Sequence, residues 1–155
     1  MSFLYIEGGR AKECLDVCEK VIALIANTPE EYECSLHIHN NRAAALNMLG
    51  RYSESITLLE QCLRYRRKHY FYKNLADAYF HLNIPEKAVM NYERAVRLDP
   101  GFDEAFYNLA VTQFMQEEYA SAGFNIGEAL KMDSQNEAYL ELREQISERI
   151  KRARI

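Results

Sequence analysis

Three asparagines recur along the chain: Asn41, Asn74 and Asn108 stand 33 and 34 residues apart. A carboxamide offers one hydrogen-bond acceptor and two donors, so it can pair with a peptide backbone whatever side chains that backbone carries. Carboxamides at a fixed interval therefore predict a ladder that binds an extended polypeptide, provided that the fold repeats with the same period.

Residues that often do catalysis or hold metals form no recognisable pattern. Cys14 and Cys18 stand four apart and His37 and His39 follow, but this spacing matches no standard zinc framework. Small buried hydrophobes explain the two cysteines better. The chain contains no phosphate-binding glycine loop, nucleophile elbow or His-Glu-x-x-His motif, and its four histidines form no acid–base pattern. We therefore expect no enzyme, no metal and no cofactor.

The segment from Arg64 to Tyr70, Arg-Tyr-Arg-Arg-Lys-His-Tyr, mixes basic and aromatic side chains as some RNA-binding surfaces do. The whole chain is acidic, with a net charge of −4, which disfavours nucleic acid and an anionic membrane as partners. A solvated basic loop is the ordinary interpretation. RNA binding stays an alternative that a steeply salt-dependent affinity for RNA would favour.

Composition indicates one globular domain. The 155 residues are 48% hydrophobic, and Pro (3) and Gly (6) are scarce, which disfavours a loop-rich or all-β chain. No apolar run is long enough to span a bilayer, and the N-terminus lacks the basic segment and apolar core of a signal peptide. We expect a cytoplasmic or nuclear protein with reduced cysteines.

A pattern of small and large residues occurs three times. It comprises Tyr72, Leu75, Ala76, Tyr79, Ala88, Tyr92, Ala95 and Pro100; then Phe106, Leu109, Ala110, Gln113, Ala122, Ile126 and Ala129; and earlier His39, Arg42, Ala43, Leu46, Ser55, Leu59 and Cys62. The small residues let two helices of a hairpin approach closely, and the large ones fill the groove between neighbouring hairpins.

These offsets resemble the tetratricopeptide repeat family over about residues 36 to 136. The departures are Arg42, Gln113 and Ser55 at positions that are usually apolar or small. The resemblance implies an all-α fold, a right-handed solenoid of stacked antiparallel helix hairpins. It also implies a non-enzymatic adaptor or scaffold that binds a peptide segment of a partner protein in a concave groove.

We expect a single domain, 1–155, in five parts. These are a partial repeat over 1–26, a repeat with an extended first helix over 29–68, repeats over 69–102 and 103–136, and a capping helix over 137–153. The second part starts at Thr28-Pro29-Glu30-Glu31, which has the pattern of a helix cap. Ser134-Gln135-Asn136-Glu137 predicts a second cap, before a helix with Tyr139, Leu142, Ile146 and Ile150 on one face.

The partial repeat would leave apolar side chains uncovered. Leu15, Cys18, Ile22 and Ile25 form a helical stripe that faces a hairpin partner only half present. Exposed apolar surface of this kind is usually covered by another chain. We therefore predict self-association through residues 1–26, as a homo-oligomer, or that the chain is a piece of a longer array.

In this family the first helix of each hairpin lines the concave face, so the resemblance places Asn41, Asn74 and Asn108 in the groove. The predicted neighbours on this face are His37, Asn40, Asn47, Tyr70, Lys73, Phe80, Tyr107 and Phe114. Aromatic side chains on a groove are typical binding anchors. Plain solvation of the asparagines is the alternative.

Two ligand classes known in the family can be compared with these residues. Chaperone-binding members hold a C-terminal carboxylate with Lys and Arg at the second and sixth repeat positions. Here those positions hold Tyr70 and Asn74, then Glu104 and Asn108, so an Hsp70 or Hsp90 tail is not the expected partner. Type III secretion chaperones, with three repeats and a last helix, remain an alternative, although the long helix after Pro29 departs from them.

Overall fold

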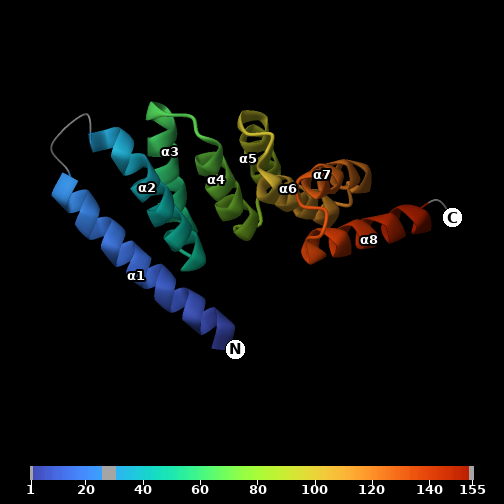
Figure 1. The fold of residues 1–155 in the computed structure, drawn as a ribbon, viewed down its shortest axis with the longest axis horizontal. Coiled ribbons are helices and arrows are strands. Elements are labelled where there is room, and N and C mark those ends of the chain that lie inside the picture. The colour runs from blue at the N-terminus through green and yellow to red at the C-terminus, as the bar shows by residue number, and fades with distance from the viewer. Residues whose placement is uncertain (1, 26–30, 154–155) are drawn as a thin grey trace.

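The computed structural model describes residues 2–25 and 31–153, which form eight α-helices. They are α1 (Ser2–Ile25), α2 (Glu31–Met48), α3 (Tyr52–Tyr65), α4 (His69–His81), α5 (Pro85–Leu98), α6 (Asp103–Met115), α7 (Tyr119–Met132) and α8 (Glu137–Arg152). The helices stand side by side, with α1 at one end of the array and α8 at the other (Figure 1). Helices adjacent in sequence pack together, which confirms the predicted all-α solenoid.

The turns inside the three hairpins share one geometry. Gly50, Asn83 and Glu117, again 33 and 34 residues apart, each have a positive φ, of 72°, 57° and 63°. The amide after each one donates to a carbonyl five residues back, as in Ile84 N to Tyr79 O at 2.9 Å. This bond satisfies a carbonyl at the end of the first helix. Glycine and asparagine adopt this conformation readily, whereas at Glu117 it costs about 1 kcal/mol.

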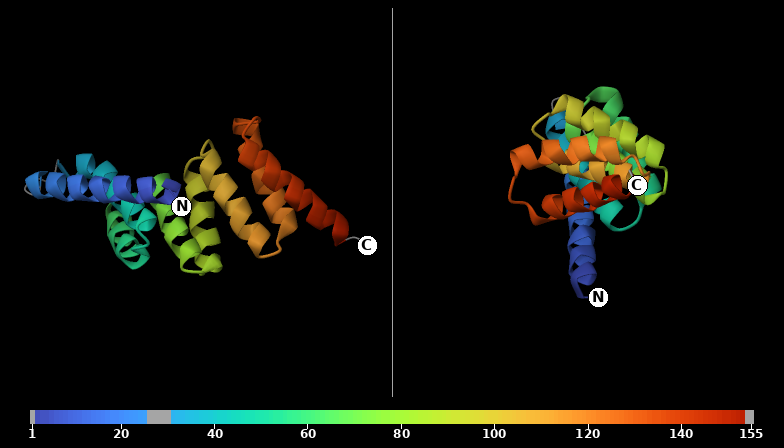
Figure 2. Two further views of the ribbon diagram at one scale, coloured as in Figure 1. Left: turned by 90° about the horizontal axis from the view of Figure 1, so that it is seen from below. Right: turned by 90° about the vertical axis from the view of Figure 1, so that its right-hand side faces the viewer.

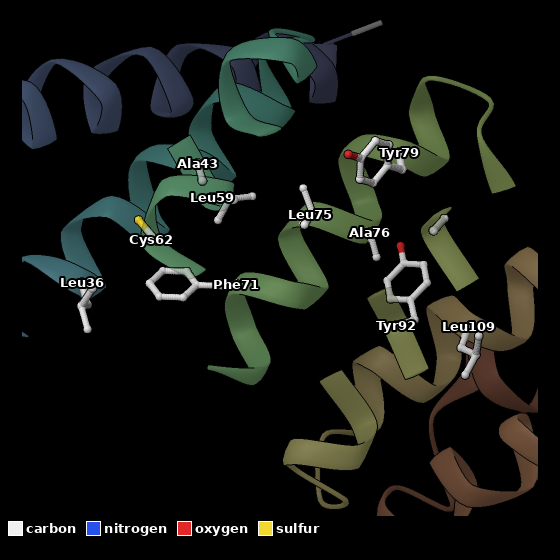
Figure 3. Packing of buried hydrophobic residues seen from close by; sticks show 11 residues of the cluster. Leu36, Ala43, Leu59, Cys62, Phe71, Leu75, Ala76, Tyr79, Tyr92 and Leu109 are labelled. Atoms are coloured by element: carbon white, nitrogen blue, oxygen red, sulfur yellow. The ribbon is translucent and has the colours of Figure 1, made fainter. Parts of the chain in front are cut away.

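The small residues of the repeat lie where the helices approach most closely. Those of the three first helices, Ala43, Ala76 and Ala110, are fully buried, and so are their second-helix counterparts Ser55, Ala88, Ala122, Ala95 and Ala129. Larger side chains fill the space beside them. Figure 3 shows Phe71 pointing from α4 toward Cys62 and Leu36, and Tyr92 beside Ala76. A bulkier residue at any of the alanines would overpack these contacts.

Each departure from the repeat pattern has a polar partner. The Ser55 hydroxyl donates to the Ala43 carbonyl at 3.1 Å, across the hairpin. Gln113 Oε1 accepts a hydrogen bond from Asn125 Nδ2 at 2.7 Å, and both side chains are buried. Arg42, which replaces a leucine, reaches Glu19 of α1 at 3.3 Å. The bonds of Ser55 and Gln113 compensate for burying polar atoms in the helix interfaces, whereas Arg42 Nε is buried without a partner among the described residues.

The N-terminal segment does not contain the turn of a hairpin. Residues 2–25 form one continuous helix, not the end of one helix, a turn and a second helix. Ala11, Leu15 and Cys18 are four and three residues apart, as one face of a single helix requires, and all three are buried. Ala11 and Leu15 pack against Ala45 and Leu46 of α2. The N-terminal end of α1 extends beyond the other helices (Figure 2).

This arrangement covers three members of the apolar stripe on which self-association was predicted, and self-association through residues 1–26 stays a prediction. The stripe of Leu15 and Cys18 is buried and Ile22 is half-buried, because α2 covers this face within the same chain. The side chain of Ile25 lies outside the described residues. Among the α1 side chains that the structure describes, those of 9–23, this stripe is covered within the chain, whereas Val17 on another face is 58% exposed.

Two helix starts were predicted from caps. The cap proposed at Thr28 lies outside the described residues, and α2 is described from Glu31. The cap of α8 is Asn136, not Ser134, because the Asn136 backbone is extended and its side chain accepts from the Tyr139 amide at 3.4 Å. The Asp133 carboxylate instead holds the turn that contains Ser134, accepting from the Gln135 amide at 3.3 Å.

Helix α8 closes the array. Tyr139, Leu142 and Ile146 are buried against α6 and α7, and Ile150 is partly buried, so the predicted apolar face is confirmed. Its other sides are polar and solvent-exposed, as the last helix of an array requires. Within residues 2–25 and 31–153, no helix has the length and hydrophobicity needed to cross a membrane.

Candidate functional site

The first helices of the three hairpins enclose a cavity of about 360 Å³, here called the first-helix groove. Its lining comes from α2, α4 and α6, with one residue from α5: Ala44, Asn47, Met48, Lys73, Asn74, Asp77, Phe80, His81, Tyr92, Asn108 and Val111. The groove thus combines a few carboxamides with charged, aromatic and aliphatic side chains. Sites that bind organic ligands commonly have this mixture.

The carboxamides of the groove are bonded to one another and to neighbouring groups. Asn74 is only 6% exposed; its Nδ2 donates to Asn40 Oδ1 at 2.8 Å, and its backbone carbonyl accepts from Asn47 Nδ2 at 2.8 Å. Asn108 Nδ2 donates to Asp77 Oδ1 at 3.4 Å. The donors are therefore engaged within the chain.

The side-chain oxygens of Asn47, Asn74 and Asn108 are not engaged by other described residues, whereas that of Asn40 accepts from Asn74. The side-chain oxygens of Asn74 and Asn108 accept no hydrogen bond from the described residues. Asn47 Oδ1 is buried without a partner among them. A buried acceptor without a donor is uncommon and costs stability. The groove is therefore chemically suited to a ligand that supplies N–H donors.

A charged cluster occupies the centre of the groove. Lys73 Nζ lies 3.1 Å from Asp77 Oδ2, one helical turn away, and 2.5 Å from Glu104 Oε1 on α6. Burial alone would lower the pKa of Lys73, but the two carboxylates outweigh it and the pKa is raised. Lys73 is therefore charged at neutral pH, and its charge is already neutralised within the chain.

Tyr92 connects the groove to the hairpin core. Its hydroxyl donates to Asp77 Oδ1 at 2.6 Å, the same oxygen that Asn108 contacts. Burial, reinforced by the Asp77 carboxylate, raises the pKa of Tyr92 well above its usual range. The phenol is therefore a permanent donor that positions Asp77 beneath the groove.

The structure brings some of the predicted site residues together and leaves others apart. Asn47, Lys73, Asn74, Phe80 and Asn108 all line the first-helix groove. Asn41 is exposed and does not line this cavity, whereas Asn40 reaches it through its bond to Asn74.

The predicted aromatic residues lie in different places, and most of them pack against other rings outside the groove lining. The rings of His37 and Tyr70 contact each other, with centroids 5.4 Å apart, beyond the groove lining. Tyr107 stacks on Tyr139 of α8 at 4.9 Å. Phe114 contacts Tyr119 at 5.7 Å and packs on the core beneath α8. Phe80 is the aromatic residue among the predicted set that lines the cavity.

Sequence reasoning missed the partners of Lys73. Asp77 lies four residues after Lys73, a spacing at which opposite charges commonly pair on a helix, so this contact had a sequence signal. Glu104 stands at the repeat position of Tyr70, so its place on this face had a signal but its pairing with Lys73 had none. Tyr92 belongs to the repeat core and had no signal as a groove residue.

Cys18 and Cys62 behave as buried hydrophobes, and Cys14 is half-buried. Burial, and then the neighbouring Cys14, raises the pKa of Cys18 to about 11, and burial raises the pKa of Cys62 to about 11. Such thiols are poor nucleophiles and poor metal ligands at neutral pH. Among the residues described here, no three His, Cys, Asp or Glu side chains cluster as a metal site would need.

The fold and the groove define a class of protein, the helical-repeat solenoids, in which stacked hairpins form a continuous surface. Two family profiles match the chain. One described as "Tetratricopeptide repeat" matches residues 36–69, and one described as "TPR repeat" matches residues 76–117. The chain is therefore a tetratricopeptide-repeat protein, and its fold is one that serves protein–protein interaction in general. No curated protein sequence matches it closely.

Several solved structures share the fold. The TPR domain of Sgt2 from Aspergillus fumigatus is 23% identical, with a TM-score of 0.71 over 82% of this chain and 83% of that chain. The second TPR domain of human RPAP3, in complex with an HSP70 peptide, is 17% identical, with a TM-score of 0.66 over 70% and 92%. The type III secretion chaperone SycD of Yersinia enterocolitica, in complex with a peptide of the translocator YopD, is 15% identical, with a TM-score of 0.63 over 76% and 90%.

Proposed function

We propose that this protein is a non-enzymatic adaptor that binds an extended segment of a partner protein in the first-helix groove. The observation that carries the proposal is the set of unengaged carboxamide oxygens on two successive hairpins, Asn74 on α4 and Asn108 on α6. The backbone N–H groups of an extended peptide would donate to them, and the ladder would be completed by Asn41 on the first hairpin.

Phe80 supplies the side-chain contact in this proposal. It lines the cavity and is half-buried, so an apolar side chain of the ligand can cover it. Backbone pairing would then provide affinity for many sequences, and Phe80 would select among them. The remaining predicted residues, His37, Tyr70, Tyr107 and Phe114, would border the path of a longer segment.

An acidic C-terminal tail is not the ligand that we propose. The RPAP3 domain binds an HSP70 peptide. In this chain, however, the cation that lines the groove beside the asparagines, Lys73, is neutralised by Asp77 and Glu104. A ligand carboxylate placed there would be repelled by these two carboxylates, and Lys73 would not be free to pair with it.

A chaperone that holds a client protein is the second candidate. SycD binds a peptide of the translocator YopD and shares the fold with this chain. Such a function would use the same groove with one dedicated client. Co-purification of a single membrane-active client, in place of several partners, would favour it over an adaptor.

A pull-down followed by mass spectrometry tests the proposal. The bait is the full chain, compared with the triple variant Asn41→Ala, Asn74→Ala, Asn108→Ala and with a matched variant that removes three exposed carboxamides elsewhere, Gln61→Ala, Gln135→Ala, Gln145→Ala. We expect partners to be captured by the wild type and the matched variant and lost from the triple variant.

Stability is checked in parallel, because Asn74 is almost buried and its bond to Asn40 is lost in the triple variant. The double variant Asn41→Ala, Asn108→Ala keeps this bond. It replaces the triple variant in the pull-down if the triple variant melts at a lower temperature than the wild type. Equal capture by the wild type and the folded variants would mean that the asparagines do not hold the ligand, and the proposal would fail.

A further inference from the structure

A second groove lies on the surface formed by α3 and α5, with α4 beneath it. Two adjoining cavities of about 430 and 340 Å³ share Arg67, Tyr72 and Arg94. We call the pair the second-helix groove. None of its lining residues also lines the first-helix groove.

Positive charge dominates the second-helix groove. Its lining includes one carboxylate, Glu60, and five exposed cations: Arg64, Arg67, Lys87, Arg94 and Arg97. None of the five makes an ion pair with the described part of the chain, and Glu60 accepts a hydrogen bond from the Tyr79 hydroxyl. Such a concentration of unpaired cations in a chain with a net charge of −4 indicates an anionic ligand.

The fold assembles this charge from separate segments. Arg64 and Arg67 lie at the end of α3 and in the loop after it, within the basic segment that the sequence had suggested for RNA. Lys87, Arg94 and Arg97 lie seven and three residues apart and therefore share one face of α5. The basic segment thus gains three further cations from the next hairpin.

Aromatic rings hold two of these cations in place. The Arg94 guanidinium lies over the Tyr72 ring, 5.7 Å from its centroid, and Lys87 Nζ lies 5.0 Å from the centroid of Tyr79. The two tyrosines are only 9% and 8% exposed. Rings covered in this way are not open to stacking by nucleobases, on which single-stranded nucleic-acid binding depends.

The floor of the groove lacks a donor. Asn91 is 1% exposed; its Nδ2 donates to the Lys87 carbonyl at 2.8 Å, whereas its Oδ1 has no hydrogen-bond partner among the described residues. A peptide backbone carries an N–H donor at almost every residue, whereas phosphodiester groups carry none and an RNA backbone donates only through its 2′-hydroxyls. The floor also presents Met90 and Leu98, which are 41% and 50% exposed and suit apolar side chains.

We propose that the second-helix groove binds a segment of another protein that interleaves acidic and apolar residues. Its carboxylates pair with the five cations, and its apolar side chains cover Met90 and Leu98. This site is separate from the first-helix groove, so the chain would join two protein segments, one held mainly by backbone hydrogen bonds and one held mainly by charge.

Fluorescence anisotropy with a labelled peptide of alternating Glu and Leu tests this proposal at low salt. The full chain is compared with Arg67→Glu, Arg97→Glu and with a matched variant of the same net charge on α8, Arg149→Glu, Lys151→Glu, whose two cations are exposed. We expect the groove variant to bind roughly tenfold more weakly or worse, and the α8 variant to bind like the wild type. Circular dichroism confirms folding, and Arg67→Gln, Arg97→Gln replaces the groove variant if that one unfolds.

The other outcomes overturn the proposal. Equal losses in both variants would show attraction to the whole chain and not to a groove, and no loss in either would show that the cations are only solvated. Tighter binding of a labelled single-stranded RNA, with the same loss in the groove variant, would identify nucleic acid as the occupant. A change of mass in light scattering on charge reversal would identify a second copy. The variant Asn41→Ala, Asn108→Ala must leave this affinity unchanged, which separates this proposal from the proposed function.

Discussion

The two grooves are built from the same hairpins but treat charge in opposite ways. In the first-helix groove Lys73 is held by Asp77 and Glu104, with a side chain only 16% exposed. In the second-helix groove the five cations are exposed and unpaired within the described residues. Charges that are already paired contribute to folding, whereas exposed unpaired charges contribute little to folding and remain available for a ligand. The first groove should therefore bind with little salt dependence and the second with a strong one.

The largest effect of this difference is expected at Lys73. Lys73→Met leaves Asp77 and Glu104 facing each other without a cation, so the free energy of unfolding should fall by about 2 kcal/mol, less than for a fully buried pair because Glu104 is half exposed. Urea denaturation measures it. The control Lys131→Met, which breaks an exposed pair with Glu128, should stay within about 0.5 kcal/mol. Equal stability of the two variants would mean that the groove charges are solvated after all.

A somewhat smaller loss is expected at Tyr92. Tyr92→Phe removes the hydroxyl that donates to Asp77, a bond from a buried group to a carboxylate, and should cost about 1–2 kcal/mol. Thermal unfolding monitored by circular dichroism measures it. Tyr119→Phe is the matched control, because no described residue bonds to its hydroxyl, and it should melt with the wild type. If Tyr92→Phe is as stable as this control, the Tyr92 hydroxyl does not contribute to the charged cluster.

Alkaline pH should reduce the stability that the charged cluster of the first-helix groove contributes to the fold. The pKa of Lys73 is raised above 10.5 in the folded chain, so the ammonium stabilises the fold at lower pH. This contribution is complete below the unfolded pKa and is lost as pH rises through the folded pKa. The difference in unfolding free energy between the wild type and Lys73→Met should therefore narrow above about pH 10. A difference that stays constant up to strongly alkaline pH would contradict the raised pKa.

The smallest effect on stability is expected in the second-helix groove. Arg67→Ala and Arg97→Ala should each change the free energy of unfolding by less than about 0.5 kcal/mol, since neither cation has an ion-pair partner among the described residues. Urea denaturation of both variants measures this. A loss comparable to that of Lys73→Met would show that these arginines hold the fold together, and the contrast between the grooves would disappear.

The repeat fold could be predicted from the sequence because its determinants are local and periodic. Small residues such as Ala43, Ala76 and Ala110 recur at the spacing of the hairpins, and all three are fully buried. The sequence shows which residues depart from the pattern, but it does not show which hydrogen bonds compensate for them. Gln113 pairs with Asn125 twelve residues away, and nothing in the repeat pattern specifies that partner.

The site was less predictable because its contacts cross between hairpins. Asn74 was predicted as a groove residue, but its bond to Asn40 depends on the packing of α4 against α2, 34 residues earlier. The same holds for Glu104, which reaches Lys73 only after the two hairpins stack. At the N-terminus a half-present hairpin was predicted over 1–26, whereas residues 2–25 form one continuous helix that packs on α2.

The central claim is that the Asn74 and Asn108 carboxamides accept hydrogen bonds from a ligand backbone, and a double-mutant cycle tests it most directly. Isothermal titration calorimetry would measure the affinity of the captured partner segment for the wild type and for Asn108→Ala. The same two affinities would be measured for copies of the segment that are N-methylated at single positions. Methylation removes one backbone N–H donor, and the substitution removes the acceptor. If they form one hydrogen bond, the two losses overlap, and at one position the cycle gives a coupling energy of about 0.5–1.5 kcal/mol. Losses that are strictly additive at every methylated position would contradict the account.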